Sequence, residues 1–252
     1  KSAKNTRGNS RRYNFYLKHQ QVLSNNLEVD LLYDKFSDKD YFDDFGTGIS
    51  RSSTTYRHRY AKLNYNKNGW DINSRFLGYQ TFDKNISQSS QPYDILPEIN
   101  AIKRWDKKIV NYDLKASLSQ WNHVSKVDGT RADIQIGIDK TFLTKGISVT
   151  PRLKIQHTRY DLERQDEELT SNPSKTIPIF SLDSIMTLSK QVRNTNIAHQ
   201  IKPRIFYLYS AEENQDDIPL FDSGLNDFSY AQLFRDNSFS GLDRNNDTNQ
   251  LT

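Results

Sequence analysis

The chain has 252 residues, of which 35% are apolar and 12% aromatic; this is poor in apolar residues for a soluble domain but too aromatic for a disordered chain. Its 35 basic and 31 acidic residues give a net charge of +4 and are mixed along the sequence, which argues against nucleic acid as a partner. The absence of cysteine excludes disulfides and cysteine-based metal sites, and no apolar run reaches the ~18 residues of a membrane-spanning helix.

Ten segments alternate apolar and polar side chains with the two-residue period of a β-strand. In one of them, Ile134, Ile136 and Ile138 alternate with Asp133 and Gln135. Most of the segments reach the ~9–11 residues that a tilted strand needs to cross a bilayer. We therefore predict strands at residues 12–20, 26–36, 54–65, 70–81, 93–104, 108–121, 131–143, 146–160, 177–189 and 196–209.

The links between these segments alternate in length. Short turns follow every odd-numbered segment, whereas longer polar links occupy residues 37–53, 82–92, 122–130, 161–176 and 210 onward. Outer-membrane barrels have short periplasmic turns and long extracellular loops. The sequence thus predicts an all-β, antiparallel transmembrane β-barrel in up-and-down order, with its apolar faces toward lipid and its long links outside.

The predicted domain organisation is a single partial barrel over residues 1–252. Residues 210–252 form its last long extracellular loop, which leads into a further strand, and Ser229–Phe234 is suited to a helical turn. No signal peptide is recognisable at the N-terminus. Ten strands with two open edges would leave backbone groups unsatisfied in lipid, so we do not expect this piece to fold alone.

Aromatic residues and prolines stand at particular places in these segments. Aromatic residues mark both ends, as the two interfacial girdles of a barrel require: Tyr65, Trp70, Trp105 and Phe142 at the short turns, and Tyr33, Tyr79, Tyr93, Trp121, Tyr160 and Tyr209 at the long links. Four prolines fall inside predicted strands, where they cannot donate to a ladder, and we interpret them as bulges or strand starts: Pro97, Pro151, Pro178 and Pro203.

The sequence contains no recognisable set of residues with the spacing of an enzyme active site. There is no G-x-S-x-G, P-loop or H-E-x-x-H motif, and the five histidines are scattered singly. We therefore predict no catalytic residue, no cofactor and no metal site. The segment 243–249 faintly resembles a calcium loop, but Thr248 stands where glycine is required, and the closing glutamate is absent or lies beyond the given residues. One acidic link remains open between a solvated loop and a site for divalent ions: it contains Asp38, Asp40, Asp43 and Asp44.

Several blocks carry a family resemblance, above all "IPLFDSGLNDFSYAQLFRDNSFSGLDR" at Ile218–Arg244 and "IKPRIFYLY" at Ile201–Tyr209. Earlier blocks are "RRYNFYLKHQ" at Arg11–Gln20, "SDKDYFDDF" at Ser37–Phe45 and "ILPEINAI" at Ile95–Ile102. Together they span nearly the whole chain, which resembles the LPS-assembly protein family LptD, also called OstA.

This resemblance implies an outer-membrane protein of Gram-negative bacteria that transports lipopolysaccharide and inserts it into the outer leaflet. It implies a larger barrel than ten strands, plugged by an LptE-like lipoprotein and fed by the periplasmic Lpt bridge through a jelly-roll domain that is absent here. The chain is then an internal piece of that barrel, and no gate residue is assigned to it.

Seven basic side chains fall on the polar face of the predicted strands, and a lysine or arginine facing lipid near the midplane would cost ~2–4 kcal/mol. We therefore place them in the lumen: Arg75, Lys115, Arg131, Arg152, Lys154, Lys202 and Arg204. They contact either the phosphates and acidic sugars of lipopolysaccharide or the plug. The alternative is that they only pair with wall carboxylates, namely Asp71, Asp113, Asp133 and Asp139.

The resemblance also suggests a packing role for the C-terminal loop over or into the lumen. The residues expected to carry it are Phe234, Arg235, Asp236, Gly241, Asp243 and Arg244.

Three other functions compete with lipopolysaccharide transport. A porin or receptor barrel for small solutes has the same architecture. An outer-membrane barrel enzyme, a phospholipase or protease, would need a Ser/His/Asn or Asp/His cluster at the outer end, which the sequence lacks. The third alternative is a soluble β-rich adhesin.

Overall fold

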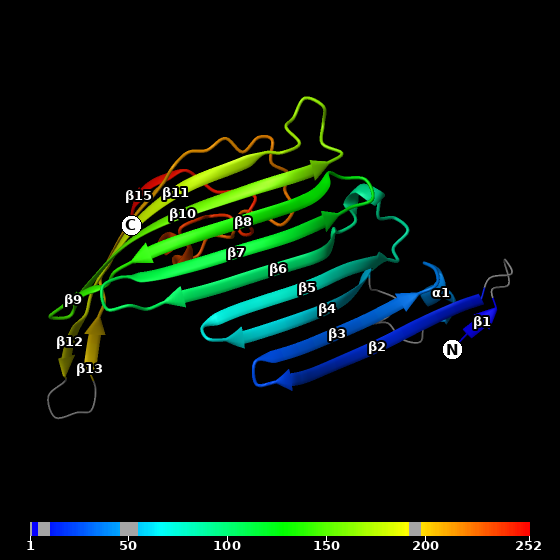
Figure 1. Cartoon of the computed structure of the whole chain (residues 1–252), viewed down its shortest axis with the longest axis horizontal. Coiled ribbons are helices and arrows are strands. Elements are labelled where there is room, and N and C mark those ends of the chain that lie inside the picture. The colour runs from blue at the N-terminus through cyan, green and yellow to red at the C-terminus, as the bar shows by residue number, and fades with distance from the viewer. Residues whose placement is uncertain (1, 5–10, 46–54, 192–197) are drawn as a thin grey trace. The chain divides into compact units, whose positions relative to one another are not determined.

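The structure is a computed structural model that describes residues 2–4, 11–45, 55–191 and 198–252. Its long strands run side by side in chain order (Figure 1). Long and short strands together, the described residues form β1 (Ser2–Lys4), β2 (Arg11–Ser24), β3 (Leu27–Phe36), β4 (Tyr56–Lys67), β5 (Trp70–Thr81), β6 (Asp94–Trp105), β7 (Asn111–Asn122), β8 (Asp128–Asp139), β9 (Phe142–Thr144), β10 (Ile147–Glu163), β11 (Ser174–Met186), β12 (Leu188–Gln191), β13 (Ala198–Ile201), β14 (Arg204–Ser210) and β15 (Thr248–Leu251).

In the part of the chain that the structure describes, helical structure is confined to three short elements: α1 (Tyr41–Phe45) and two 3-10 turns, η1 (Gln88–Ser90) and η2 (Tyr230–Phe234). The turn expected within Ser229–Phe234 is therefore confirmed. Among the described residues, no helix has the length and apolar character needed to cross a membrane.

Strand pairing follows the chain. The hydrogen-bonded order is β1-β2-β3-β4-β5-β6-β7-β8-β10-β11-β14-β15, with β9 added to β10 and β12 paired with β13 in a separate ribbon. Neighbouring strands pair antiparallel, so the predicted all-β up-and-down architecture is confirmed. The chain forms two compact units: unit 1 comprises residues 1–101, 117–132 and 161–171, and unit 2 comprises 102–116, 133–160 and 172–252.

Tight turns explain where several strands end. Asn68 and Gly69 have φ of 53° and 76°, and Lys145 and Gly146 have φ of 42° and 84°. Positive φ at two consecutive residues is typical of the two-residue hairpin turns that match strand twist. At Asn68–Gly69 the strands pair up to Lys67↔Trp70.

The structure corrects the predicted boundaries in several places. β2 continues to Ser24, because two residues suffice for its turn, and β8 begins three residues earlier than expected, at Asp128. Each of three predicted strands is divided in two: 131–143 gives β8 and β9, 177–189 gives β11 and β12, and 196–209 gives β13 and β14. Residues 196 and 197 lie outside the described part of the chain.

In unit 2 the polar face is buried and the apolar face is exposed. On β8, Asp133 and Asp139 are 7% and 6% exposed, whereas Ile134 and Ile136 are 42% and 57% exposed. β10 repeats the pattern, with Gln156 buried and Ile155 exposed. This is the reverse of a water-soluble sheet, in which the apolar face is buried.

Each unit also has a small apolar core. In unit 2 the core consists of Ile177, Ile179, Phe206 and Leu208, with Phe234 packed against it. In unit 1, Phe36 and Phe82 form a pair with Tyr41 beside them.

Two of the expected girdle residues lie elsewhere. Trp121 and Tyr160 are 4% and 0% exposed, so their rings point to the buried face instead of an interface. The strand-start interpretation holds for Pro203, which lies immediately before β14. Pro151 and Pro178 lie inside β10 and β11, and each of their carbonyls accepts a backbone hydrogen bond at 3.3 Å. Pro97 lies inside β6.

Candidate functional site

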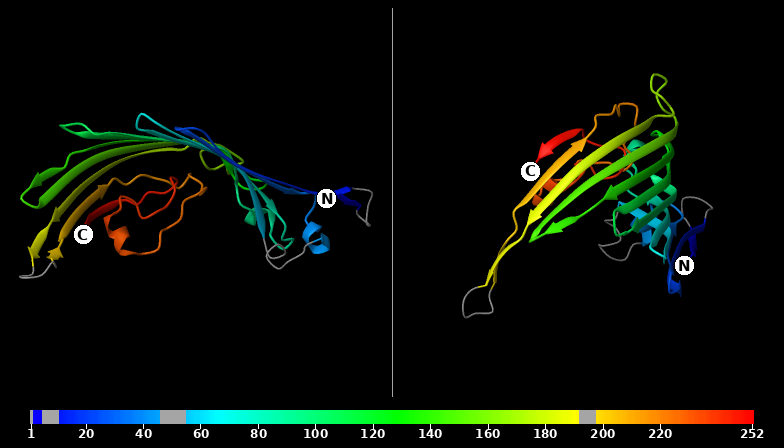
Figure 2. Two further views of the ribbon diagram at one scale, coloured as in Figure 1. Left: turned by 90° about the horizontal axis from the view of Figure 1, so that it is seen from below. Right: turned by 60° about the vertical axis from the view of Figure 1, so that its left-hand side comes forward.

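The candidate site is the polar face of unit 2 together with the C-terminal loop, residues 211–247. The loop follows β14 and returns beneath the strands of unit 2 to reach β15 (Figure 2). Its side chains bond to inward-facing residues of β10 and β11 at several points, which the next paragraphs describe in turn.

Asp243 holds the loop together from inside. Its side chain is 0% exposed, and its carboxylate accepts the hydroxyl of Tyr160 at 3.0 Å and the backbone N–H groups of Phe221 and Asp222 at 2.7 and 2.9 Å. Nearby, Gly241 has φ +67°, and a Cβ there would lie 2.7 Å from the Asp222 carbonyl oxygen. The loop conformation therefore requires both a carboxylate at 243 and a glycine at 241.

A buried polar chain connects the loop to the strands. The Lys175 ammonium donates to Asn245 Oδ1 at 2.7 Å, and Asn245 Nδ2 donates to Gln156 Oε1 at 3.3 Å. Gln156 and Thr158 in turn donate to the same Asp133 carboxylate oxygen at 2.8 and 2.7 Å. Because these groups satisfy one another, the polar face can be buried without the cost of unpaired polar atoms.

Ion pairs extend this network toward the short-turn end of the strands. Lys154 donates to Asp236 of the loop at 2.6 Å and Arg152 to Asp113 at 2.7 Å. Arg104 binds both oxygens of Asp139 at 3.0 and 3.1 Å. The inward charges of unit 2 are thus largely neutralised by neighbours.

Gly137 makes room for one of these carboxylates. A Cβ at this position would lie 2.4 Å from Asp113 Oδ1. A side chain at 137 would therefore displace Asp113 from its place beside Arg152.

Arg204 and Phe234 join the loop to the apolar core. Arg204 binds Asp183 through two bonds of 2.8 Å, and its guanidinium lies 4.0 Å from the centre of the Phe234 ring. The Phe234 ring also meets Phe206 edge-on at 6.0 Å. The cation–π and ring contacts place η2 against β14.

The seven basic residues singled out in the sequence do not form one cluster. Arg152, Lys154 and Arg204 belong to unit 2 and bind carboxylates, as described above. In unit 1, Arg75 binds Glu98 and Arg131 lies buried, 5.4 Å from the centre of the Trp121 ring. Lys115 and Lys202 are exposed, and Lys202 lies in the break between β13 and β14 instead of within a strand.

The loop residues singled out in the sequence are mostly engaged. Besides Phe234, Asp236, Gly241 and Asp243, Arg244 donates to the backbone carbonyls of Ile218 at 2.6 Å and Asp243 at 3.2 Å. Arg235 differs, because its side chain is exposed. Their role in transport stays a prediction.

Sequence reasoning missed four members of the network. The sequence places Tyr160 in a girdle, and Lys175 lies two residues before the predicted start of its strand, although it shares the inward phase of Ile177 and Ile179. Gln215 and Asn245 lie in a loop, where no periodicity indicates which side chains are buried. Gln215 accepts from Lys175 at 3.3 Å and from the Asn245 backbone at 2.9 Å.

The acidic link in unit 1 binds cationic side chains. Arg12, which is 4% exposed, donates two bonds to Asp38, at 2.9 and 2.7 Å, and also pairs with Asp44. Lys84 pairs with Asp40, and the Asp43 side chain lies outside the described residues. In the described ranges, no group of three His, Asp or Glu residues is placed to hold a metal ion.

The Arg12 pair shifts the titration of Asp38. Burial raises the pKa of the Asp38 carboxyl, but hydrogen bonds from Arg12 and Ser37 outweigh it, so the pKa lies below its ordinary value.

Comparison with known proteins covers almost the whole chain. Residues 10–252 match the family model LptD, described as LPS transport system D. The LPS-assembly protein LptD of Nitrosococcus oceani is 34% identical over 90% of this chain and 31% of its own length, and that of Hahella chejuensis is 31% identical over 100% and 33%. The corresponding protein of Neisseria meningitidis serogroup A is 29% identical over 97% of this chain and 31% of its own length.

The chain spans about a third of the length of these relatives. Because the family model matches residues 10–252, and the all-β meander agrees with it, this chain belongs to the LptD family.

Proposed function

We propose that this chain is part of the outer-membrane barrel through which lipopolysaccharide is transported and inserted into the outer leaflet. The family is one of transport and assembly proteins, and its curated members are named LPS-assembly proteins. The outer membrane of a Gram-negative bacterium is the corresponding location. The chain contributes wall and conduit and performs no catalysis.

The observation that carries this proposal is the inverted distribution of polarity in β8 and β10. Exposed rows of isoleucine and leucine are suited to contact with the hydrocarbon of a bilayer. The buried polar residues Asp133, Gln156 and Lys154 are suited to a lumen that is filled by a polar loop. In a soluble adhesin the exposed row would be polar.

The lumen-facing cations divide into structural and available groups. Arg152, Lys154 and Arg204 are held by Asp113, Asp236 and Asp183. Lys115 is different: it is exposed on the inward face of β7, and in the described part of the chain it has no ion-pair partner. Lys115 is therefore available to meet a phosphate or a carboxylate of the substrate, or of an LptE-like plug.

The test depletes the full protein that contains this chain and follows newly made lipopolysaccharide at the cell surface with an impermeant label. Surface lipopolysaccharide should stop increasing after depletion and resume with the unchanged protein. Lys115→Glu should slow delivery severalfold at an equal amount of folded barrel, and Lys115→Arg should not.

A porin or receptor would give the opposite pattern. Lipid vesicles containing the purified protein would take up small sugars quickly, and depletion would leave surface lipopolysaccharide unchanged. Co-purification of a plug lipoprotein and of periplasmic Lpt components with the full protein tests the proposed partners separately.

A further inference from the structure

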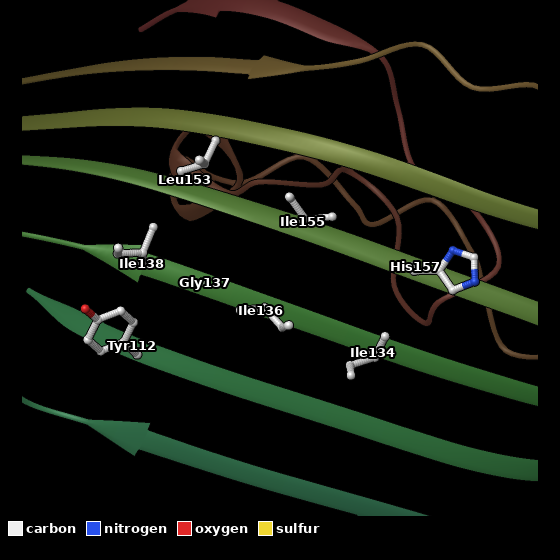
Figure 3. A pocket seen from close by; sticks show the side chains of 8 residues that line it. All are labelled: Tyr112, Ile134, Ile136, Gly137, Ile138, Leu153, Ile155 and His157. Carbon is white, nitrogen blue, oxygen red and sulfur yellow. The ribbon is translucent and has the colours of Figure 1, made fainter.

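The outward face of unit 2 is hollowed by a groove of about 420 Å³ between β7, β8 and β10. Its floor is formed by alternate residues of two neighbouring strands, whose side chains lie in rows on one face (Figure 3): Ile134, Ile136, Ile138, Leu153 and Ile155. Tyr112 lies at one end of the groove and His157 at the other. The groove is thus apolar along its length and polar at both ends.

The length of the groove matches one leaflet of a bilayer. From Leu153 to His157 the strand advances four residues, which at ~3.3 Å per residue is about 13 Å. The hydrocarbon core of a bilayer is ~30 Å thick. A single acyl chain lying along the strands in this groove therefore spans no more than the thickness of one leaflet.

The His157 end carries polar and cationic groups. His157 Nδ1 lies 2.8 Å from Thr176 Oγ1, and the next outward residue of β10, Arg159, is exposed and pairs in register with Ser174. Facing lipid, an arginine is tolerated near an interface and costly at the midplane. Arg159 therefore marks the level of lipid headgroups, where its guanidinium suits a phosphate.

On the outward face of β10, the positive charge is confined to this level. Beyond Arg159, the two remaining outward residues of β10 are Asp161 and Glu163. In this row of β10, Arg159 is thus the one arginine or lysine, and it lies between the apolar groove and these carboxylates. The position of Arg159 therefore favours a ligand whose anionic group lies at the level of the lipid headgroups.

Orientation identifies the leaflet. β10 passes from the short turn at Lys145–Gly146 to the long link that follows Glu163, and long links are extracellular in outer-membrane barrels. Resting on the function proposed above, we propose that the groove holds one acyl chain of an outer-leaflet lipopolysaccharide molecule, whose phosphate binds Arg159 beside His157 and Thr176. This is a lipid site on the outside of the wall, separate from the loop-filled lumen.

A crosslinking experiment tests the proposal in cells that produce the full protein. The photoreactive residue benzoyl-phenylalanine replaces Ile136, which lies in the groove and is 57% exposed, or Leu118, which is 44% exposed on β7 and does not line it. After irradiation, lipopolysaccharide and phospholipid adducts are separated and quantified. We expect a lipopolysaccharide adduct at 136 that Arg159→Glu lowers about fivefold and Arg159→Lys preserves, whereas the adduct at 118 does not change.

Three outcomes would overturn the proposal: equal adducts at both positions that ignore Arg159→Glu, adducts at 136 with phospholipid alone, or no lipid adduct at 136. Ile136→Trp, which fills the groove, is a second check and should lower the amount of lipopolysaccharide retained by the purified protein relative to Leu118→Trp.

Failure of the site can be separated from failure of the proposed function. Surface delivery of lipopolysaccharide is measured in the same strains. Normal delivery with no Arg159-dependent adduct rejects the lipid site alone, whereas loss of the depletion effect rejects the transport function. The crosslinking is repeated in vesicles that already contain lipopolysaccharide, where it does not depend on transport.

Discussion

The polar faces of the two units are built from similar side chains, but one is covered by a loop and the other forms an open groove. In unit 2, the C-terminal loop covers the face, and Asp133, Gln156 and Lys175 are buried in a closed hydrogen-bond network. In unit 1, the polar face of β4, β5 and β6 is an open groove of about 420 Å³, lined by Lys62, Asn64, Asn73, Ser74, Arg75, Glu98 and Asn100. The same strand chemistry therefore supports either a sealed or an open surface, and the difference lies in the loop.

Loop residues decide this difference because each buried polar atom needs a partner. Asn245 supplies an acceptor for Lys175 and a donor for Gln156. In the open groove of unit 1, the described lining residues all belong to strands, and no described loop side chain takes that place. We expect substitutions in the sealed face to affect stability, and substitutions in the open face to affect binding.

The largest loss of stability is expected from Asp243→Ala, which should release the C-terminal loop and expose the polar face of unit 2. The change leaves the Tyr160 hydroxyl and two backbone N–H groups without their acceptor, at a cost of about 3 kcal/mol. Chemical unfolding of the full protein in detergent measures the loss, and protease sensitivity of residues 211–247 reports the loop. The control is Asp247→Ala, an exposed position. Equal stability of the two variants would contradict the central role of Asp243.

A smaller effect is expected when equivalent cations are removed from the two faces. The side chains of Lys154 and Asp236 are 10% and 30% exposed, whereas that of Arg75 is 39% exposed. Lys154→Met should lower the free energy of unfolding by about 2 kcal/mol, because it leaves Asp236 without its cation.

Arg75→Met should change the same quantity by less than about 1 kcal/mol, since exposed pairs contribute little. Lys115→Met is the unpaired control and should be neutral. A loss for Arg75→Met as large as that for Lys154→Met would show that the open face is sealed in the full protein.

The smallest effect concerns pH and the acidic link of unit 1. The pKa of Asp38 is lower in the folded protein than in the unfolded chain, so its contribution is fully present above the unfolded pKa of ~3.9 and is lost as pH falls through the lower folded pKa. Because the Asp38 side chain is 34% exposed, solvent screens part of this contribution.

Pepsin digestion of residues 37–45 in the full protein measures this, from about pH 5 to about pH 2. The native protein should resist cleavage better than Arg12→Gln at the upper end, and the difference should vanish toward the lower end. A difference that stays constant with pH would mean that the contacts of Arg12 with the Tyr41 and Phe45 rings, at 5.8 and 5.0 Å, hold the link instead.

Strand positions and faces follow from the sequence to a large extent. The alternation around Ile134, Ile136 and Ile138 predicted both the strand and the side that is exposed, because a two-residue period places alternate side chains on opposite faces. The short turn predicted between residues 65 and 70 lies within two residues of the observed one, Asn68–Gly69, where positive φ favours asparagine and glycine.

The partners of the inward charges did not follow from the sequence. Arg152 pairs with Asp113, one of the expected carboxylates, but Asp139 pairs with Arg104 and Lys154 with Asp236 of a loop 82 residues away. Strand phase gives the side of the sheet on which a charge lies, whereas its partner depends on register and on long-range contacts. Trp121 and Tyr160 were misplaced for the same reason, because a position at a strand end does not reveal what covers it.

The sequence by itself determined the strands, their apolar and polar faces and the family, since these depend on local periodicity and on blocks of consecutive residues. Only the tertiary structure decided that Asp243 and Asn245 are buried, that Lys175 belongs to a sealed network while Lys115 stays open, and that a groove forms between β7, β8 and β10. These features arise where residues distant in the chain are brought into contact, and hydrogen-bond satisfaction between them depends on distances that no local pattern encodes.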